Sequence, residues 1–274
     1  KETLNSFTDS TNVKQRNLRL DTTTRFDASY ALDGPWRLIA GASTTRQENQ
    51  AGLVTGSDFT TNAVDGGVRY QFATGSSLSY LMRTNKGSYL NRAVPNTGAF
   101  DDQYTQLDND LRLRWLMGTG STVNANLTHI NRTHPRYGQR DYNGFNFGAG
   151  VDWALTGKTS LSTSISHTLD AYATSNSNYS GTDKISVSAG WQISPKVGLR
   201  LKNDWAQRSY LGSPSTTASS NRQDITRDTT LSVNWQAHEQ LALSASLQQS
   251  SRGVNQANLD YDSTMLFFTA QLTY

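Results

Sequence analysis

Strict two-residue alternation of apolar and polar side chains runs through most of this chain and leaves few folds open to it. Residues 17–32 read NLRLDTTTRFDASYAL, with the large apolar residues on even positions and every charged residue on odd positions. Successive side chains of a β-strand point to opposite faces of a sheet, so the pattern predicts a strand with one apolar and one polar face. An alternation of this length predicts a strand well above the usual length of about 5–6 residues.

The alternating unit recurs roughly every 38 to 45 residues, which makes it an internal repeat. In each unit an aromatic residue precedes a short turn, and a strand led by Leu or Val follows, as in WALTGKTSL (153–161), WQISPKVGL (191–199) and WQAHEQLAL (235–243). The short turns are predicted at residues 33–35, 74–76, 118–120, 156–158, 194–196 and 238–240. The connections between units are long and polar, at about 47–63, 85–103, 133–143, 170–183, 210–223 and 250–261.

This layout of short turns at one end and long loops at the other predicts a transmembrane antiparallel up-and-down β-barrel. Alternation gives thirteen strands from residue 17 onward. Single-chain bacterial barrels have an even number of strands, so the segment Glu2–Asp9 is the candidate for a fourteenth. We therefore expect an all-β, fourteen-stranded barrel, with twelve or sixteen strands as alternatives. Residues 1–274 would form a single domain with both termini on the periplasmic side.

Composition separates this reading from a helical membrane protein and from a soluble β-protein. The chain is only 35% hydrophobic, its mean hydropathy is −0.61, and no apolar run approaches the roughly 20 residues of a spanning helix. A soluble β-solenoid or sandwich remains the alternative. The membrane barrel differs from this alternative in one requirement. A charge that faces lipid is costly, so we expect no charged residue on the apolar row in the middle of any strand.

Aromatic residues gather beside the short turns, as the interfacial girdle of a membrane barrel requires. The predicted girdle comprises Tyr30, Trp36, Tyr70, Trp115, Trp153, Trp191, Trp235 and Tyr274. The last strand, Thr264–Tyr274, ends the sequence on an aromatic residue and resembles the C-terminal insertion signal of bacterial outer-membrane barrels. That resemblance implies the barrel-assembly machinery as a partner.

The polar row of each strand would face the lumen of the barrel. Its predicted pore-lining residues are Arg19, Arg25, Arg37, Arg69, Arg83, Asp108, Asp110, Arg112, Arg114, Lys184, Arg200, Lys202, Asp204 and Arg208. Such residues set the ionic selectivity of a pore, or else form Arg–Asp ladders that brace the wall. Because basic residues outnumber acidic ones, we expect a weak preference for anions. Small inward residues such as Gly148, Ser162 and Ser188 leave open space for a passage or for an inserted loop.

Other function classes find little support. The net charge of +3 is too small to indicate nucleic-acid binding, and the sequence has no cysteine. The four histidines show no metal-binding spacing, and Ser166 and His167 are sequence neighbours that would point to opposite faces of a strand. We therefore expect no catalytic residues, no metal and no cofactor. Loop tyrosines such as Tyr89 and Tyr142 would stack on sugar rings or pack within the protein.

The repeated turn motif and the terminal FFTAQLTY resemble the β-barrel porin group that includes the EpsL-type proteins of exopolysaccharide operons. The resemblance extends over nearly the whole chain and implies passage of a secreted polysaccharide across the bacterial outer membrane. A general or small-solute porin, and a non-transporting structural or adhesion barrel, are the alternatives. The expected partners are membrane lipids, lipopolysaccharide and the polysaccharide cargo, and no nucleic acid. The basic loop at residues 134–140 would contact lipopolysaccharide phosphates or fold into the pore.

Overall fold

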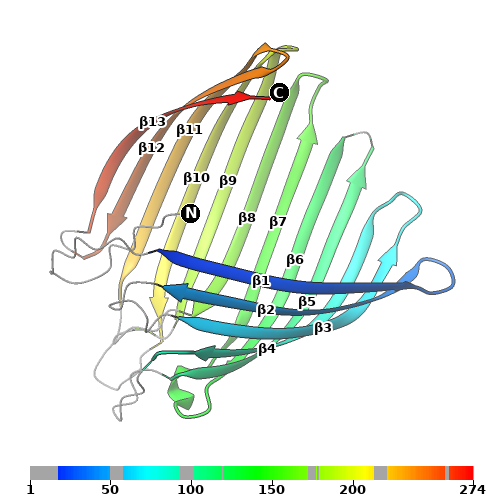
Figure 1. The fold of residues 1–274 in the computed structure, drawn as a ribbon, viewed down its shortest axis with the longest axis vertical. Helices are drawn as coiled ribbons and strands as arrows, with labels where there is room; N and C mark the ends of the chain where they lie inside the picture. Colours follow the sequence, from blue (N-terminus) through cyan, green and yellow to red (C-terminus); the bar gives the residue numbers. More distant parts are fainter. Residues whose placement is uncertain are drawn as a thin grey trace.

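The computed structural model describes residues 18–49, 58–92, 101–118, 120–171, 177, 179–212, 221–256 and 259–273. They form one antiparallel sheet in which each strand is hydrogen-bonded to the next along the chain (Figure 1). The thirteen strands are β1 (Arg19–Ala31), β2 (Trp36–Asn49), β3 (Phe59–Gln71), β4 (Ser77–Tyr89), β5 (Gln103–Met117), β6 (Ser121–Thr133), β7 (Tyr142–Ala154), β8 (Thr159–Ala171), β9 (Tyr179–Ser194), β10 (Val197–Leu211), β11 (Gln223–His238), β12 (Leu241–Val254) and β13 (Tyr261–Leu272). A short 3-10 helix, η2 (Gly138–Arg140), precedes β7. No helix among these residues is long and apolar enough to cross a membrane.

The thirteen strands predicted from alternation are confirmed, and so are the positions of the six short turns. Each strand has 12 to 16 residues, well above the usual length of about 5–6. Three of the short turns contain glycine in the left-handed region of backbone conformation, two of them at Gly34 and Gly75. Gly34 has φ 77° and Gly75 has φ 84°, values that a residue with a Cβ atom adopts only at a cost.

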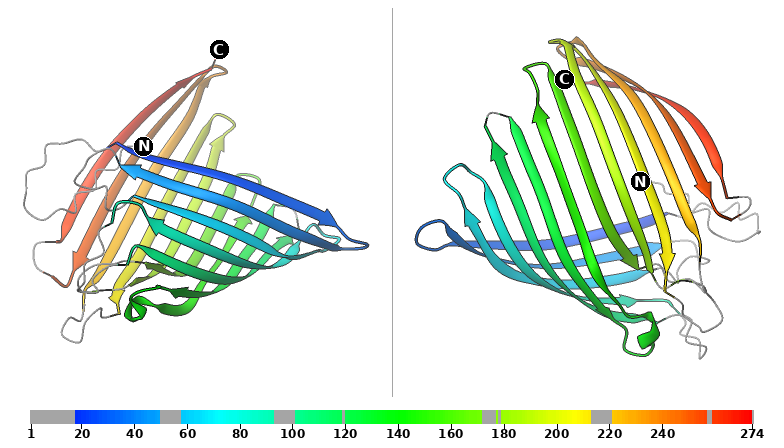
Figure 2. Two further views of the ribbon diagram at one scale, coloured as in Figure 1. Left: turned by 60° about the horizontal axis from the view of Figure 1, so that its bottom comes forward. Right: turned by 180° about the vertical axis from the view of Figure 1, so that it is seen from behind.

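The sheet curves continuously, so that its first strands run at a steep angle to its last ones (Figures 1 and 2). Its two edges are β1 and β13, and within the described residues no ladder joins them. The sheet is thus all-β, antiparallel and up-and-down as predicted. The proposed fourteenth strand, Glu2–Asp9, lies outside the described residues, so closure and the final strand number stay predictions.

Large apolar side chains cover the outside of this sheet instead of filling a core. Phe26 and Phe268 are 74% and 75% exposed, and most other members of the apolar row are also exposed. Only five apolar side chains are buried among the described residues: Ala63, Leu81, Ile130, Tyr142 and Tyr210. A soluble sandwich would bury its apolar row, whereas a barrel in a membrane turns that row toward lipid.

In the described strands the middle of the apolar row carries no charged residue, as expected, and charges enter this row only toward the loop ends. Lys86, Asp183 and Arg227 are exposed members of this row, and each lies within five residues of the loop end of its strand. Eight residues separate Arg227 from Trp235, which corresponds to roughly 20 Å along the membrane normal at a tilt of about 40°. These charges therefore mark the loop-side border of the apolar band, where lipid headgroups begin.

Candidate functional site

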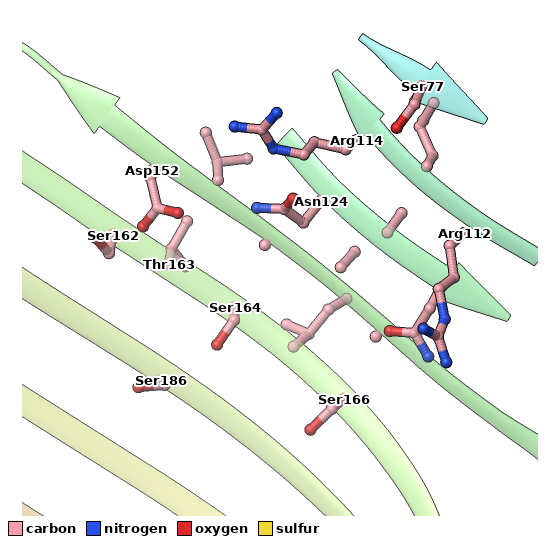
Figure 3. A pocket seen from close by; sticks show the side chains of 18 of the residues that line it. Ser77, Arg112, Arg114, Asn124, Asp152, Ser162, Thr163, Ser164, Ser166 and Ser186 are labelled. Carbon is pink, nitrogen blue, oxygen red and sulfur yellow. The ribbon is translucent and has the colours of Figure 1, made fainter. Parts of the chain in front are cut away.

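The concave face of the sheet contains an open hollow of about 1020 Å³. Side chains of the polar row line it, from β3 at one wall to β10 at the other. Figure 3 shows polar and charged side chains from β4 to β9 that line this space. The polar row thus lies on the inside of the curve, where the predicted lumen would be.

Small residues form the floor of the hollow on β7, β8 and β9. Ser162 and Ser164 of β8 lie opposite Ser188 and Ser186 of β9 in the ladder, and Ser164 also faces Gly150 of β7. These side chains are short, so they leave the space above them open, and their hydroxyl groups can donate and accept hydrogen bonds. No aromatic residue is present among the residues that line the hollow in the described part of the chain.

Basic residues form the two walls beside this floor. Arg112 and Arg114 rise from β5, and Arg200 and Lys202 rise from β10. Arg112 forms an ion pair with Asp110. Within the described segments, neither Arg114 nor Arg200 makes an ion pair or a side-chain hydrogen bond, so their charge is available to a solute.

On β10 and β9 two lysines share one carboxylate. Lys202 Nζ lies 2.6 Å from Asp204 Oδ2, and Lys184 Nζ lies 3.5 Å from Asp204 Oδ1. One negative charge against two positive charges leaves this wall with a net positive charge.

A second group of predicted lumen residues serves mainly to brace the wall. Arg25 Nη1 and Arg83 Nε lie 3.2 and 3.3 Å from the same oxygen of Asp65, whose side chain is only 2% exposed. Arg25 also pairs with Asp27. A Cβ atom at Gly41 would lie 2.7 Å from Arg25 Nη2 and 2.8 Å from Asp65 Oδ2, so a larger residue there would displace these side chains.

The remaining predicted lumen residues are distributed along the same face. Arg19 pairs with Asp21 at 2.9 Å, and Arg208 Nε donates to Thr182 Oγ1 at 3.2 Å. Asp108 accepts hydrogen bonds from Asn85 and Gln106. Arg37 and Arg69 lie directly opposite each other on β2 and β3. Of the fourteen predicted residues, the structure brings six to the hollow: Arg69, Asp110, Arg112, Arg114, Arg200 and Lys202.

The described aromatic residues near the short turns form a band on the outer face. Trp153, Trp191 and Trp235 are each about half exposed, and each lies within four residues of the end of its strand. Tyr30, Trp36, Tyr70 and Trp115 occupy the same level on the first strands, where the rings of Trp36 and Tyr70 meet edge to face at 5.0 Å. Tyr274, the eighth predicted member, lies outside the described residues.

Contacts between the long loops were not predicted from the sequence. The carboxylate of Asp101, 3% exposed, accepts hydrogen bonds from the backbone N–H groups of Arg136 at 2.9 Å and Tyr137 at 3.2 Å. Nearby, burial lowers the pKa of His134, although its hydrogen bond to Asp141 acts in the opposite direction. The basic loop at residues 134–140 is therefore fastened to the start of β5.

The loop-end tyrosines are engaged within the protein. Tyr142 is buried and stacks on Tyr179 with ring centroids 5.1 Å apart, and the guanidinium of Arg92 lies 3.4 Å from the centre of the Tyr89 ring. These contacts favour internal packing over sugar stacking for Tyr89 and Tyr142.

Histidines on the outer face make polar pairs that the sequence did not reveal. His167 Nδ1 lies 2.7 Å from Asp183 Oδ1, while its ring stacks on Phe147. His129 Nε2 lies 2.9 Å from Asn143 Oδ1. No cluster of three metal-ligating side chains occurs in the segments that the structure describes.

Comparison with known proteins gives one family and several similar folds. The profile of the family described as "Putative beta-barrel porin 2" matches residues 128–274, more than half of the chain. The FrpB iron transporter from Neisseria meningitidis is similar in fold, with a TM-score of 0.58 and 13% identity over 88% of this chain and 44% of that one. The alcaligin outer-membrane receptor FauA from Bordetella pertussis gives a TM-score of 0.58 and 12% identity over 93% of this chain and 50% of that one. This chain thus spans about half the length of either structure. A search of curated proteins gave no match.

Proposed function

This chain belongs to the family described as "Putative beta-barrel porin 2", and from that premise we propose that it is a passive outer-membrane channel with a preference for anions. The observation that carries the proposal is the hollow on the concave face. A water-filled space lined by charged and small polar side chains, inside a sheet whose outer face is apolar, is the arrangement of a diffusion pore.

The preference for anions follows from the charges that line this hollow. Five cationic residues line it, Arg69, Arg112, Arg114, Arg200 and Lys202, against two carboxylates, Asp110 and Asp152. The ion pairs of Arg112 and Lys202 neutralise part of this excess of positive charge. The charges of Arg114 and Arg200 are not neutralised by an ion pair within the described residues. Fixed positive charge along a pore attracts anions and repels cations.

For the cargo, export of a secreted exopolysaccharide is the leading proposal. Its support is the resemblance of the turn motifs and the final strand to the EpsL-type barrels. The second candidate is a porin for small solutes. It is favoured by the absence of aromatic rings from the described lining of the hollow, because a path for neutral sugars commonly offers ring faces for stacking.

Closure of the barrel is part of the proposal. Strands β1 and β13 are both odd members of an antiparallel series, so they run in the same direction. One further strand of opposite direction would close the sheet with antiparallel pairing throughout. We assign this place to residues 2–9, which makes fourteen strands in a single domain and leaves both termini on the periplasmic side.

Ion selectivity in planar bilayers tests the channel. With a KCl gradient across the membrane, the wild-type protein should conduct, and the sign of its reversal potential should show a preference for chloride over potassium. The double variant Arg112→Ser/Arg114→Ser should shift the reversal potential toward the value of a cation-selective pore. Arg227→Ser removes one positive charge from the outer face and should leave the reversal potential unchanged. Absence of conductance in the wild type would contradict both transport proposals and favour a structural or adhesion barrel.

The same bilayers separate the two cargo proposals. Block by an acidic oligosaccharide, at concentrations where glucose and glucuronate have no effect, would favour polysaccharide export. Equal effects of the oligosaccharide and the small solutes would favour the general porin.

A further inference from the structure

Three arginines and two serines occupy neighbouring positions at the short-turn end of β3, β4 and β5. In the ladder, Ser79 of β4 lies between Arg69 of β3 and Arg112 of β5. Ser77, two residues earlier on β4, lies opposite Arg114 of β5. All five residues line the hollow. We call these five residues the arginine–serine cluster.

The arginine–serine cluster has an excess of positive charge that the protein does not neutralise. Asp110 pairs with Arg112, but in the described part of the chain neither Arg69 nor Arg114 has a carboxylate partner or a side-chain hydrogen bond. Arg37 faces Arg69 directly across the ladder and adds a further positive charge. Like charges opposite each other in a sheet are destabilising, so this arrangement costs stability as it stands.

A buried donor points to what is missing. The Nε atom of Arg69 is buried and has no hydrogen-bond partner. A buried N–H group without an acceptor is unfavourable, and in native proteins such groups usually contact water or an ion. An anion bound beside Arg69 would supply the acceptor and the negative charge together.

We propose that the arginine–serine cluster is a binding subsite for an oxyanionic group, carboxylate or phosphate, carried by the solute that passes through the channel. This inference rests on the proposed channel function. Guanidinium groups hold such oxyanions through paired N–H donors, and the hydroxyl groups of Ser77 and Ser79 can donate to the remaining oxygen lone pairs. In the same hollow, beyond β6 and β7, the serines of β8 and β9 offer hydrogen bonds to hydroxyl groups. The combination fits an acidic or phosphorylated saccharide better than a neutral one.

Calorimetric titration of the purified full-length protein in detergent micelles tests this subsite without requiring conduction. Sodium D-glucuronate, inorganic phosphate and D-glucose serve as the probes. We expect saturable binding of glucuronate or phosphate and none of glucose, and the tighter of the two anions identifies the chemistry of the group. Arg69→Ser/Arg114→Ser should weaken anion binding by at least about tenfold, because it removes two charge-assisted contacts. The control variant Arg227→Ser should stay within about twofold of the wild type.

Two further measurements keep the outcomes distinct. Arg69→Lys/Arg114→Lys retains the charges and removes the paired donors, so it should bind anions with intermediate affinity and provides the test if the serine variant does not fold. Conduction without anion binding, or equal binding by the serine variant and Arg227→Ser, would overturn the subsite and leave the channel standing. Binding that depends on the arginines in a protein that does not conduct would support the subsite and overturn the channel.

Discussion

At the scale of single residues, the carboxylate of Asp101 accepts four backbone hydrogen bonds at the loop end of the sheet. One carboxylate oxygen accepts the N–H groups of Arg136 and Tyr137, and the other accepts those of Asp102 and Gln103. Burial acts to raise the pKa of Asp101, but these hydrogen bonds, led by that from Arg136, hold it below the ordinary value of 3.8. The carboxylate therefore stays ionised at neutral pH and fastens the basic loop to β5.

Asp101→Asn should loosen this loop while leaving the strands intact. The amide retains one acceptor oxygen and introduces a donor that meets backbone N–H groups, so we expect the loop to lose about 1–3 kcal/mol of local stability. Hydrogen exchange at Arg136 and Tyr137 should then accelerate. Asp33→Asn, in an exposed short turn, is the control and should not change the exchange rates of Arg136 and Tyr137. Unchanged exchange at Arg136 in the Asp101 variant would contradict the role assigned to this carboxylate.

The pH dependence of this contact follows from the direction of the pKa shift. Because the pKa of Asp101 is lower in the folded protein than in the unfolded chain, its stabilisation is present above about pH 3.8 and is lost as the pH falls through the folded value. Exchange protection of Arg136, corrected for intrinsic rates, should be flat between pH 5 and 8 in the wild type. A decline within that range would show that another group controls the loop.

At the scale of the strand, β11 shows how alternation assigns side chains to lipid and to water. Leu231, Val233 and Trp235 form its outer row, and Leu231 is 45% exposed on the apolar band. Ser232 belongs to the inner row and faces the concave side. The two positions are neighbours in sequence, so they offer a matched pair for testing the membrane orientation.

Leu231→Arg should destabilise the protein in lipid vesicles by about 2–4 kcal/mol, because the guanidinium would lie in the middle of the apolar band. Ser232→Arg adds the same side chain to the water-filled side and should change stability by less than about 1 kcal/mol. Reversible urea unfolding from vesicles measures both values. If the two variants lose equal stability, the outer row does not face lipid.

Alternation was sufficient to predict the strands and the short turns, because these depend only on residues close in sequence. It was insufficient where contacts cross a long loop. The position of Ser79 between Arg69 and Arg112 depends on the register of β4 with β5, and residues 90–102 between these strands contain no signal that sets it. The Asp101 contacts were missed for the same reason. The contact of Asp183 with His167 on the outer face was not predicted, because the limits of the apolar band depend on how neighbouring strands lie in the folded sheet.

At the scale of the whole molecule, the described sheet has two free edges, β1 and β13. Each edge presents unpaired backbone groups, which are unfavourable in hydrocarbon. If residues 2–9 supply the closing strand, removing residues 1–9 should prevent formation of the compact barrel. Electrophoresis without boiling measures this, since a closed barrel migrates differently from the unfolded chain. A synthetic peptide of residues 1–10, added during refolding, should restore the compact form.

The opposite result is equally informative. A chain without residues 1–9 that still gives the compact form would show that another segment closes the sheet. Failure of the peptide to rescue the shortened chain would point to a general folding defect and would also contradict closure by this segment.

Pairing only between strands adjacent in sequence also determines how a protein of this kind can change size over evolutionary time. Every ladder in the described sheet joins consecutive strands, so each hairpin contacts only its two neighbours. Duplication or loss of one hairpin would leave all other registers intact and would change only the circumference. The width of the passage therefore varies in discrete steps of two strands, and the chemistry of its wall varies independently, one inward-facing residue at a time.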